Sequence, residues 1–293
     1  MLNSERWWRW ATIVAATTIA LTLGACSAMR LVYGQANEIT YWWLDGYLDF
    51  DDAQSVRARE TLNQYFAWHR RSQLPDYAEL LRTVANGVGE DTTGTRSCEW
   101  FAQVRRRADV AVEQALPEAA ALLASLGPEQ LRALERKHAK NNAEFKDDFL
   151  QRDPAKRQAR SVERAIERSE QLYGRLNEAQ RKLVEQRVAA SPFDPERWNQ
   201  ERLRRQRELV ATVTRAQQPQ ASREAIAGEL RDLWRHALRS PDADYARYQQ
   251  ALETYNCEFF AEIHNQTTPE QRAEAQRRLR GWESDFRRLA GAG

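Results

Sequence analysis

SCEWFAQVRRRADVAVEQALPEAAALLASL, residues 97–126, is the clearest amphipathic pattern in the chain. Its apolar positions recur at steps of three or four residues without a break: Phe101, Val104, Ala108, Val112, Ala115, Ala119, Leu122 and Leu126. That spacing places them on one face of an α-helix. Pro117 removes one backbone donor, so we expect a kink there. The stretch predicts a long helix that buries one side against its neighbours.

The rest of the chain repeats this pattern. Charged residues make up 29% of the sequence, glycine and proline are sparse, and alanine, leucine, glutamate, glutamine and arginine are abundant, which favours helices. We expect an all-α fold, either a multi-helix bundle or an elongated array of antiparallel amphipathic helices. The predicted helices cover about 53–71, 74–87, 97–126, 155–176, 178–189, 195–216, 222–239, 244–265 and 269–290, with a further one from Pro128. The polar loop 90–95 should be mobile.

The N-terminus resembles a secretory signal. Arg6 and Arg9 precede an apolar run, residues 11–23, and Leu23 with the small residues Gly24 and Ala25 comes before Cys26. An apolar run of about 13 residues is short for a membrane span, which needs roughly 20. The run 23–26 looks like the lipobox of bacterial lipoproteins, which implies that Cys26 is lipidated. The residue after the cysteine is Ser27 rather than Asp, which resembles the outer-membrane class of bacterial lipoproteins. We therefore predict a signal peptide over 1–25, a lipidated tether over 26–36 and one helical periplasmic domain over 37–293.

The predicted location affects which partners the protein can meet and whether its cysteines form a disulfide. The whole chain has 44 basic and 42 acidic side chains, and removal of 1–25 leaves it nearly neutral, so neither its charge nor its compartment suits a nucleic-acid partner. Cys98 and Cys257 remain after lipidation of Cys26, and an oxidising periplasm favours a disulfide between them. Cys257 also lies off the apolar stripe of its predicted helix, where a free thiol would be exposed.

Residues 37–54 hold the densest mixture of aromatic rings and carboxylates. Trp42, Trp43 and Tyr47 are either core anchors or an exposed patch near the membrane for lipid headgroups, glycan or peptide. Asp51 and Asp52 suit helix caps. A calcium loop starting at Asp49 would need an Asp or Asn and a Gly where Ala53 and Gln54 stand, so we exclude it.

A second polar group interrupts a core stripe. On the helix from Pro128, His138 and Asn142 occupy positions that the pattern reserves for apolar side chains. Burying them is costly unless they are hydrogen bonded. They form either a polar layer that fixes helix register or, with Asp148, a small pocket for a ligand or peptide. The sequence leaves both interpretations open.

Three segments share a capped helix start with glutamine at the third helical position. They are Leu126-Gly127-Pro128-Glu129-Gln130, Leu176-Asn177-Glu178-Ala179-Gln180 and Thr267-Thr268-Pro269-Glu270-Gln271. Acids near the positive end of a helix and a preceding breaker are a general start signal. The segments also resemble the Leu-Thr-x-x-Gln motif of Spy-like periplasmic helical proteins, some of which are chaperones.

Several runs together resemble a proteobacterial lipoprotein family of unknown function. They are the lipobox, YWWLDGYLDFDDAQ at 41–54, KNNAEFKDDF at 140–149 and SPFDP at 191–195. The resemblance covers nearly the whole mature chain. It implies an outer-membrane lipoprotein and brings no activity and no catalytic residues.

No catalytic signature is present in the sequence. It contains no nucleophile elbow, no phosphate-binding glycine loop and no His-Glu-x-x-His helix, and its four histidines are scattered. We therefore expect no enzyme activity, no cofactor and no metal. The leading hypothesis is a lipid-anchored protein on the periplasmic face of the outer membrane that binds another envelope protein or peptide, as a chaperone or assembly factor. The alternatives are a small-ligand carrier or envelope enzyme using His138 and Asn142, and a purely structural lipoprotein.

Overall fold

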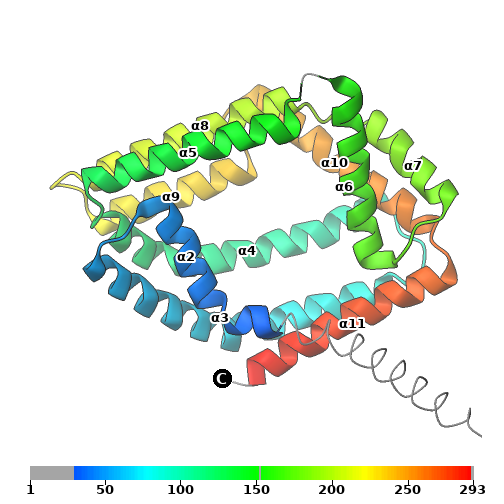
Figure 1. The fold of residues 1–293 in the computed structure, drawn as a ribbon. Coiled ribbons are helices and arrows are strands. Elements are labelled where there is room, and N and C mark those ends of the chain that lie inside the picture. The colour runs from blue at the N-terminus through cyan, green and yellow to red at the C-terminus, as the bar shows by residue number, and fades with distance from the viewer. Residues whose placement is uncertain (1–29, 152, 292–293) are drawn as a thin grey trace, which may run out of the picture.

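The computed structural model describes residues 30–151 and 153–291. The predicted signal peptide and Cys26 lie outside these residues. The described chain forms ten helices, α2 to α11, and no strand (Figure 1), which confirms the all-α prediction. The helices are α2 Ala36–Leu48, α3 Asp52–Gly87, α4 Gly94–Leu123, α5 Pro128–Phe149, α6 Pro154–Tyr173, α7 Glu178–Ala189, α8 Pro195–Ala216, α9 Arg223–Leu238, α10 Ala243–Asn265 and α11 Pro269–Gly291. None of the described helices is long and apolar enough to cross a membrane.

Local sequence explains most helix starts. Side-chain oxygens accept hydrogen bonds from the first free backbone N–H groups of eight of the described helices; the capping residues are Asp51, Thr93, Asp153, Asn177, Asp194, Ser222, Asp242 and Thr268. Such caps satisfy donors that have no partner inside the helix. Proline, which lacks a donor, opens α5, α6, α8 and α11.

Two expectations near the first long helices are wrong. A break before Pro75 was predicted, but α3 continues through it as one helix of 36 residues. Leu74 and Ala78 on either side of the proline are fully buried, and their packing holds the helix together despite the lost donor. The loop 90–95 is not loose either. Asn265 donates to the Thr92 carbonyl at 2.9 Å and accepts from its N–H at 2.8 Å, so the loop is fixed to α10.

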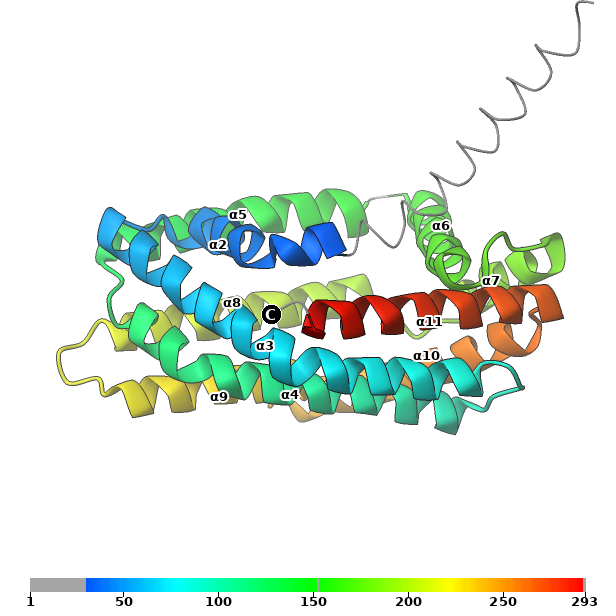
Figure 2. The ribbon, with the colours of Figure 1, turned by 90° about the horizontal axis from the view of Figure 1, so that it is seen from below.

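The helices pack around two separate hydrophobic cores. Core A gathers α2, α4, α5, α8 and α9 around Leu48, Ala120, Leu123, Leu126, Leu134, Val213, Ala216 and Ile226. Core B gathers α3, α4, α6, α7, α10 and α11 around Ala85, Val88, Trp100, Tyr173, Leu176, Val184, Ile263, Ala275 and Leu279. The long helices α3 and α4 join the two ends, with α11 lying along α3 (Figures 1 and 2).

The repeated glutamines pair across each end. Gln180 and Gln271 hydrogen bond to one another at 2.6 and 3.0 Å, and each accepts from the backbone N–H that opens its own helix. Each side chain also donates to the carbonyl two residues before the other helix's N-cap, at Gln266 and Arg175. The start of α7 is thus locked to the start of α11.

The same arrangement recurs at the other end. Gln54 and Gln130 pair, cap their own helices, and donate to the Ser125 and Asp49 carbonyls, which again lie two residues before the opposite N-cap. Gln54 is a fourth copy that the sequence comparison missed, although Phe50-Asp51-Asp52-Ala53-Gln54 has the same spacing. The repeat is therefore a tertiary device as well as a capping signal.

The disulfide is confirmed. Cys98 of α4 and Cys257 of α10 are bonded, with their Cα atoms 5.3 Å apart. The expected exposure of Cys257 is wrong, because it is only 1% exposed. The contact between α4 and α10 covers the side of α10 that the apolar stripe left out.

The packed domain begins earlier than expected. Residues 30–34, within the range predicted to be a tether, are helical. The Tyr33 hydroxyl lies 2.7 Å from His69 Nδ1, and Arg30 Nε lies 3.5 Å from the buried carboxylate of Asp285 on α11. The chain is therefore attached to α3 and α11 from Arg30 onward.

Candidate functional site

The aromatic segment divides between two faces of α2. Tyr41 and Leu48 are buried against the domain, whereas Trp42 and Trp43 are 63% and 60% exposed. The interpretation as core anchors is therefore wrong for Trp42 and Trp43. The exposed rings form a candidate binding face.

Tyr47, Asp51 and Asp52 serve the connection between α2, α3 and α5. Tyr47 contacts the Trp43 ring at 4.9 Å, and its hydroxyl accepts a hydrogen bond of 2.7 Å from Asn141 on α5. Asp51 accepts from the Gln54 N–H at 2.8 Å as the N-cap of α3, and Asp52 is the first residue of that helix. These three residues hold helices together.

The structure does not bring His138, Asn142 and Asp148 to one site. Asn142 makes two reciprocal hydrogen bonds with Gln206 of α8, at 2.8 and 3.0 Å, so its amide is used to join α5 to α8. His138 contacts the Tyr47 ring edge-on, and burial lowers its pKa. Asp148 lies ten residues after His138, which corresponds to about 15 Å along the helix. The polar-layer interpretation fits Asn142 best.

Asp148 instead lines a cavity of about 690 Å³, which we call the arginine cavity. It is lined by the end of α5, by α6, by the end of α7 and the loop after it, by the start of α8 and by α10. Its aromatic and apolar wall includes Phe149, Phe193, Trp198 and Phe259. This size lies within the range of small-molecule sites, roughly 300–1,000 Å³. Two of the runs quoted above, at 140–149 and 191–195, therefore meet around one cavity.

Four arginines and a single carboxylate line this cavity. The arginines are Arg157, Arg164, Arg168 and Arg187, and the carboxylate is Asp148. Burial lowers the pKa of Arg164, and the nearby charge of Arg168 lowers it further. The cavity thus holds an excess of positive charge that an anion would offset.

The arginines are only partly occupied. Arg164 donates to the Ser161 hydroxyl at 3.1 Å and lies over the Phe149 ring at 4.6 Å. Arg187 Nε is 3.2 Å from Glu262, but its buried Nη2 has no hydrogen-bond partner. Since a buried donor without a partner is costly, a ligand oxygen at this position would be stabilised.

The sequence analysis did not single out these arginines. A signal was present: positions 157, 164 and 168 are separated by seven and four residues and share one face of α6. Val162 and Ile166 of α6 pack on core B instead. What the sequence alone did not show is that α8 and α10 close over the basic face.

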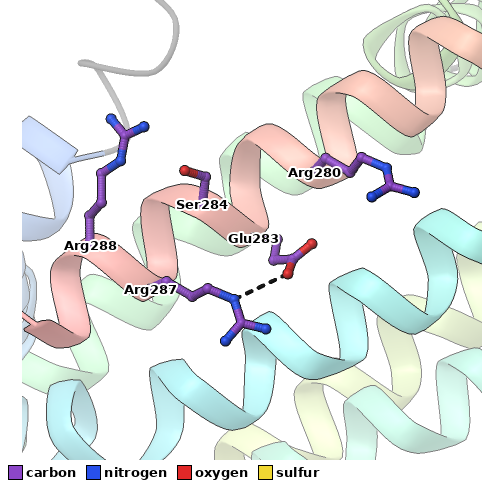
Figure 3. A pocket seen from close by; sticks show the side chains of 5 residues that line it. All are labelled: Arg280, Glu283, Ser284, Arg287 and Arg288. Atoms are coloured by element: carbon purple, nitrogen blue, oxygen red, sulfur yellow. Dashed lines mark hydrogen bonds and ion pairs between the residues drawn. The ribbon is translucent and has the colours of Figure 1, made fainter.

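Another depression lies on α11 and has a different character. Figure 3 shows that its lining residues Arg280, Glu283, Ser284, Arg287 and Arg288 all come from that one helix. Arg287 is already paired with Glu283 and with Glu79 of α3. This surface lacks the several walls of the arginine cavity. Among the described residues, no group of three or more His, Cys, Asp or Glu side chains is placed to hold a metal ion.

Comparison with known proteins identifies a family and no activity. The model of a family of unknown function, DUF6279, matches residues 46–240, and the chain belongs to that family. The match includes α5 to α8 and the arginines of the cavity. No curated protein and no protein of known structure matches the chain.

Proposed function

We propose that this member of DUF6279 is a lipid-anchored protein of the outer membrane that binds another envelope component through the arginine cavity. The single observation that carries the proposal is the placement of four arginines and several aromatic rings around one cavity. Such a site suits an acidic segment with apolar side chains, because guanidinium groups bind carboxylates and the rings take up the apolar parts. Binding of this kind fits an assembly factor or a chaperone.

The proposed location has support from the sequence and from the fold. The N-terminal run ending in Cys26 resembles a lipobox, and the Cys98–Cys257 disulfide is the kind of bond that persists in an oxidising compartment. Acyl labelling of the wild-type chain and of Cys26→Ser tests the anchor. Labelling that is unchanged in Cys26→Ser would overturn it.

Binding at the cavity can be tested with a defined probe. The full lipoprotein in nanodiscs is titrated calorimetrically with a synthetic peptide of alternating Phe and Asp residues. We expect the double variant Arg164→Gln/Arg168→Gln to weaken binding at least about tenfold, because each lost charge-assisted bond contributes about 1.5–3 kcal/mol. Arg160→Gln is the matched control, since Arg160 lies on α6, is exposed and does not line the cavity.

The control and the ligand series decide the outcome. Equal weakening in Arg160→Gln and the double variant would show a general charge effect and contradict the cavity. Absence of peptide binding in the wild type would also contradict it. Thermal unfolding of each variant checks that the fold is retained.

A small-ligand carrier is the second candidate function, and the volume of about 690 Å³ favours it. The ligand would be an amphiphilic anion rather than a molecule held by His138 and Asn142, because Asn142 is paired with Gln206. Titration with laurate under the same conditions separates the two functions. Tighter binding of laurate than of the peptide would favour the carrier.

A further inference from the structure

Helix α2 carries apolar side chains on two opposite faces. Its inner face buries Tyr41 and Leu48. Ile39, Trp42 and Trp43 are exposed on the opposite side, at a spacing of three and four residues that aligns them on the helix. A surface helix normally keeps its outer face polar, so an exposed apolar face indicates a contact outside the chain.

The exposed face continues toward the N-terminus. Leu31 and Val32, in the helical segment 30–34 just before α2, are 72% and 58% exposed. One charge beside these rings is already paired: Glu38 of α2 is bound to Arg59 of α3, whose guanidinium lies over the Tyr41 and Trp42 rings. The exposed side chains of the patch itself are apolar and aromatic.

The position of this face in the chain indicates what covers it. The 29 residues before Arg30 include the apolar run 11–23 and Cys26. Cys26 precedes Arg30 by four residues, which span at most about 14 Å when extended. Figure 2 shows α2 and α5 together on one side of the molecule and α9 on the other. An anchor at Cys26 would thus hold the α2 side of the domain next to the bilayer.

We propose that the outer face of α2 lies in the headgroup layer of the membrane. Tryptophan prefers this interface, since its ring is apolar and its N–H can still be hydrated. The inference rests on the lipid anchor and is independent of ligand binding at the arginine cavity. The domain would then lie on the membrane in one orientation rather than hang from a free tether.

Depth-dependent quenching tests the orientation. The acylated lipoprotein is reconstituted into phosphatidylcholine vesicles that contain brominated lipid, and tryptophan fluorescence is recorded. We expect clear quenching in the wild type and loss of most of it in Trp42→Phe/Trp43→Phe. Trp198→Phe is the control: this tryptophan lines the arginine cavity, so its removal should leave the quenching in place. Quenching that is unaffected by the double replacement would overturn the inference.

Photocrosslinking identifies the occupant directly. A benzophenone side chain at position 43 should form adducts with lipid, whereas one at position 104 of α4, where Val104 is also exposed, should not. Adducts from position 43 to a second copy of the chain or to another protein would contradict membrane seating. If acylation is confirmed and the peptide binds but position 43 fails to reach lipid, this inference fails while the proposed function stands.

Discussion

The two ends of the molecule use the same glutamine pair in different surroundings. At the core B end, Gln180 is 1% exposed and Asn177 and Thr268 supply side-chain caps to the two helices. At the core A end, Gln54 and Gln130 are 7% and 8% exposed, and the N-cap of α5 is Gly127, which has no side chain to offer. The shared device fixes helix starts, and its surroundings determine how much it stabilises.

The core B end also carries a covalent link. Cys98–Cys257 joins α4 to α10. His264, about two turns further along α10, is fully buried; it accepts a hydrogen bond from the Tyr173 hydroxyl at 2.9 Å and donates to the Glu90 carbonyl at 2.8 Å. The core A end has the exposed α2 face and no disulfide. We therefore expect core B to be the more stable end and core A the more adaptable one.

Removal of the disulfide should have the largest effect. The variant Cys98→Ala/Cys257→Ala opens a connection of 159 residues, and we expect it to lower the free energy of unfolding by about 2–4 kcal/mol. Chemical denaturation measures the loss. Hydrogen exchange should then accelerate more in α10 than in α8 and α9. Equal acceleration at both ends would show that they unfold as one unit and would contradict the expected difference in stability between core A and core B.

Truncation of the paired glutamine side chains should have the second-largest effect on stability. Gln180→Ala leaves the Gln266 carbonyl and the Asn177 N–H without their partner, and we expect a loss of about 2–3 kcal/mol. Gln54→Ala should cost less, about 1–2 kcal/mol, because Gln54 itself is 7% exposed whereas Gln180 is 1% exposed. Urea unfolding of both variants gives the difference.

Gln186→Ala is the matched control for this experiment. Gln186 lies on α7 like Gln180, but it is exposed and makes no side-chain hydrogen bond in the described structure. Its loss should be within about 0.5 kcal/mol. A loss for Gln54→Ala that equals or exceeds that for Gln180→Ala would mean that burial does not set the contribution of the pair.

Most of the fold could be predicted from the sequence because helix starts are local. Caps such as Asn177, and prolines such as Pro195 at the first helical position, act within one turn, and the apolar spacing of α4 is complete in itself. The continuity of α3 through Pro75 could not be predicted in this way. It depends on the burial of Leu74 and Ala78 by other helices, which no local pattern encodes.

The candidate site was less predictable for the same reason. Its basic side chains could be found from their spacing on α6, but their meeting with Phe193, Trp198 and Asp148 depends on how six segments pack. His138 and Asn142 were candidate site residues because they interrupt an apolar stripe. Asn142 is hydrogen bonded to Gln206, which lies 64 residues away in the chain, and the apolar stripe alone does not predict this partner.

Low pH should produce the smallest difference in stability between the core A end and the core B end. Burial lowers the pKa of both His138, near core A, and His264, at core B, so the folded state favours the neutral rings. This contribution to stability is complete above the unfolded pKa of about 6.5 and is lost as the pH falls through the lower folded values. We expect the free energy of unfolding to be lower at pH 5.0 than at pH 7.5.

The replacement His138→Leu separates the two contributions. His138 is partly exposed and makes no hydrogen bond in the described structure, so leucine should fit the apolar stripe with little change in stability at pH 7.5. The acid-induced loss should then shrink by less than about 1 kcal/mol, because solvent screens a partly exposed ring. Unfolding in urea at the two pH values measures it. A variant with the full acid sensitivity of the wild type would place all of that sensitivity elsewhere, with the buried ring of His264 at core B as the first group to examine.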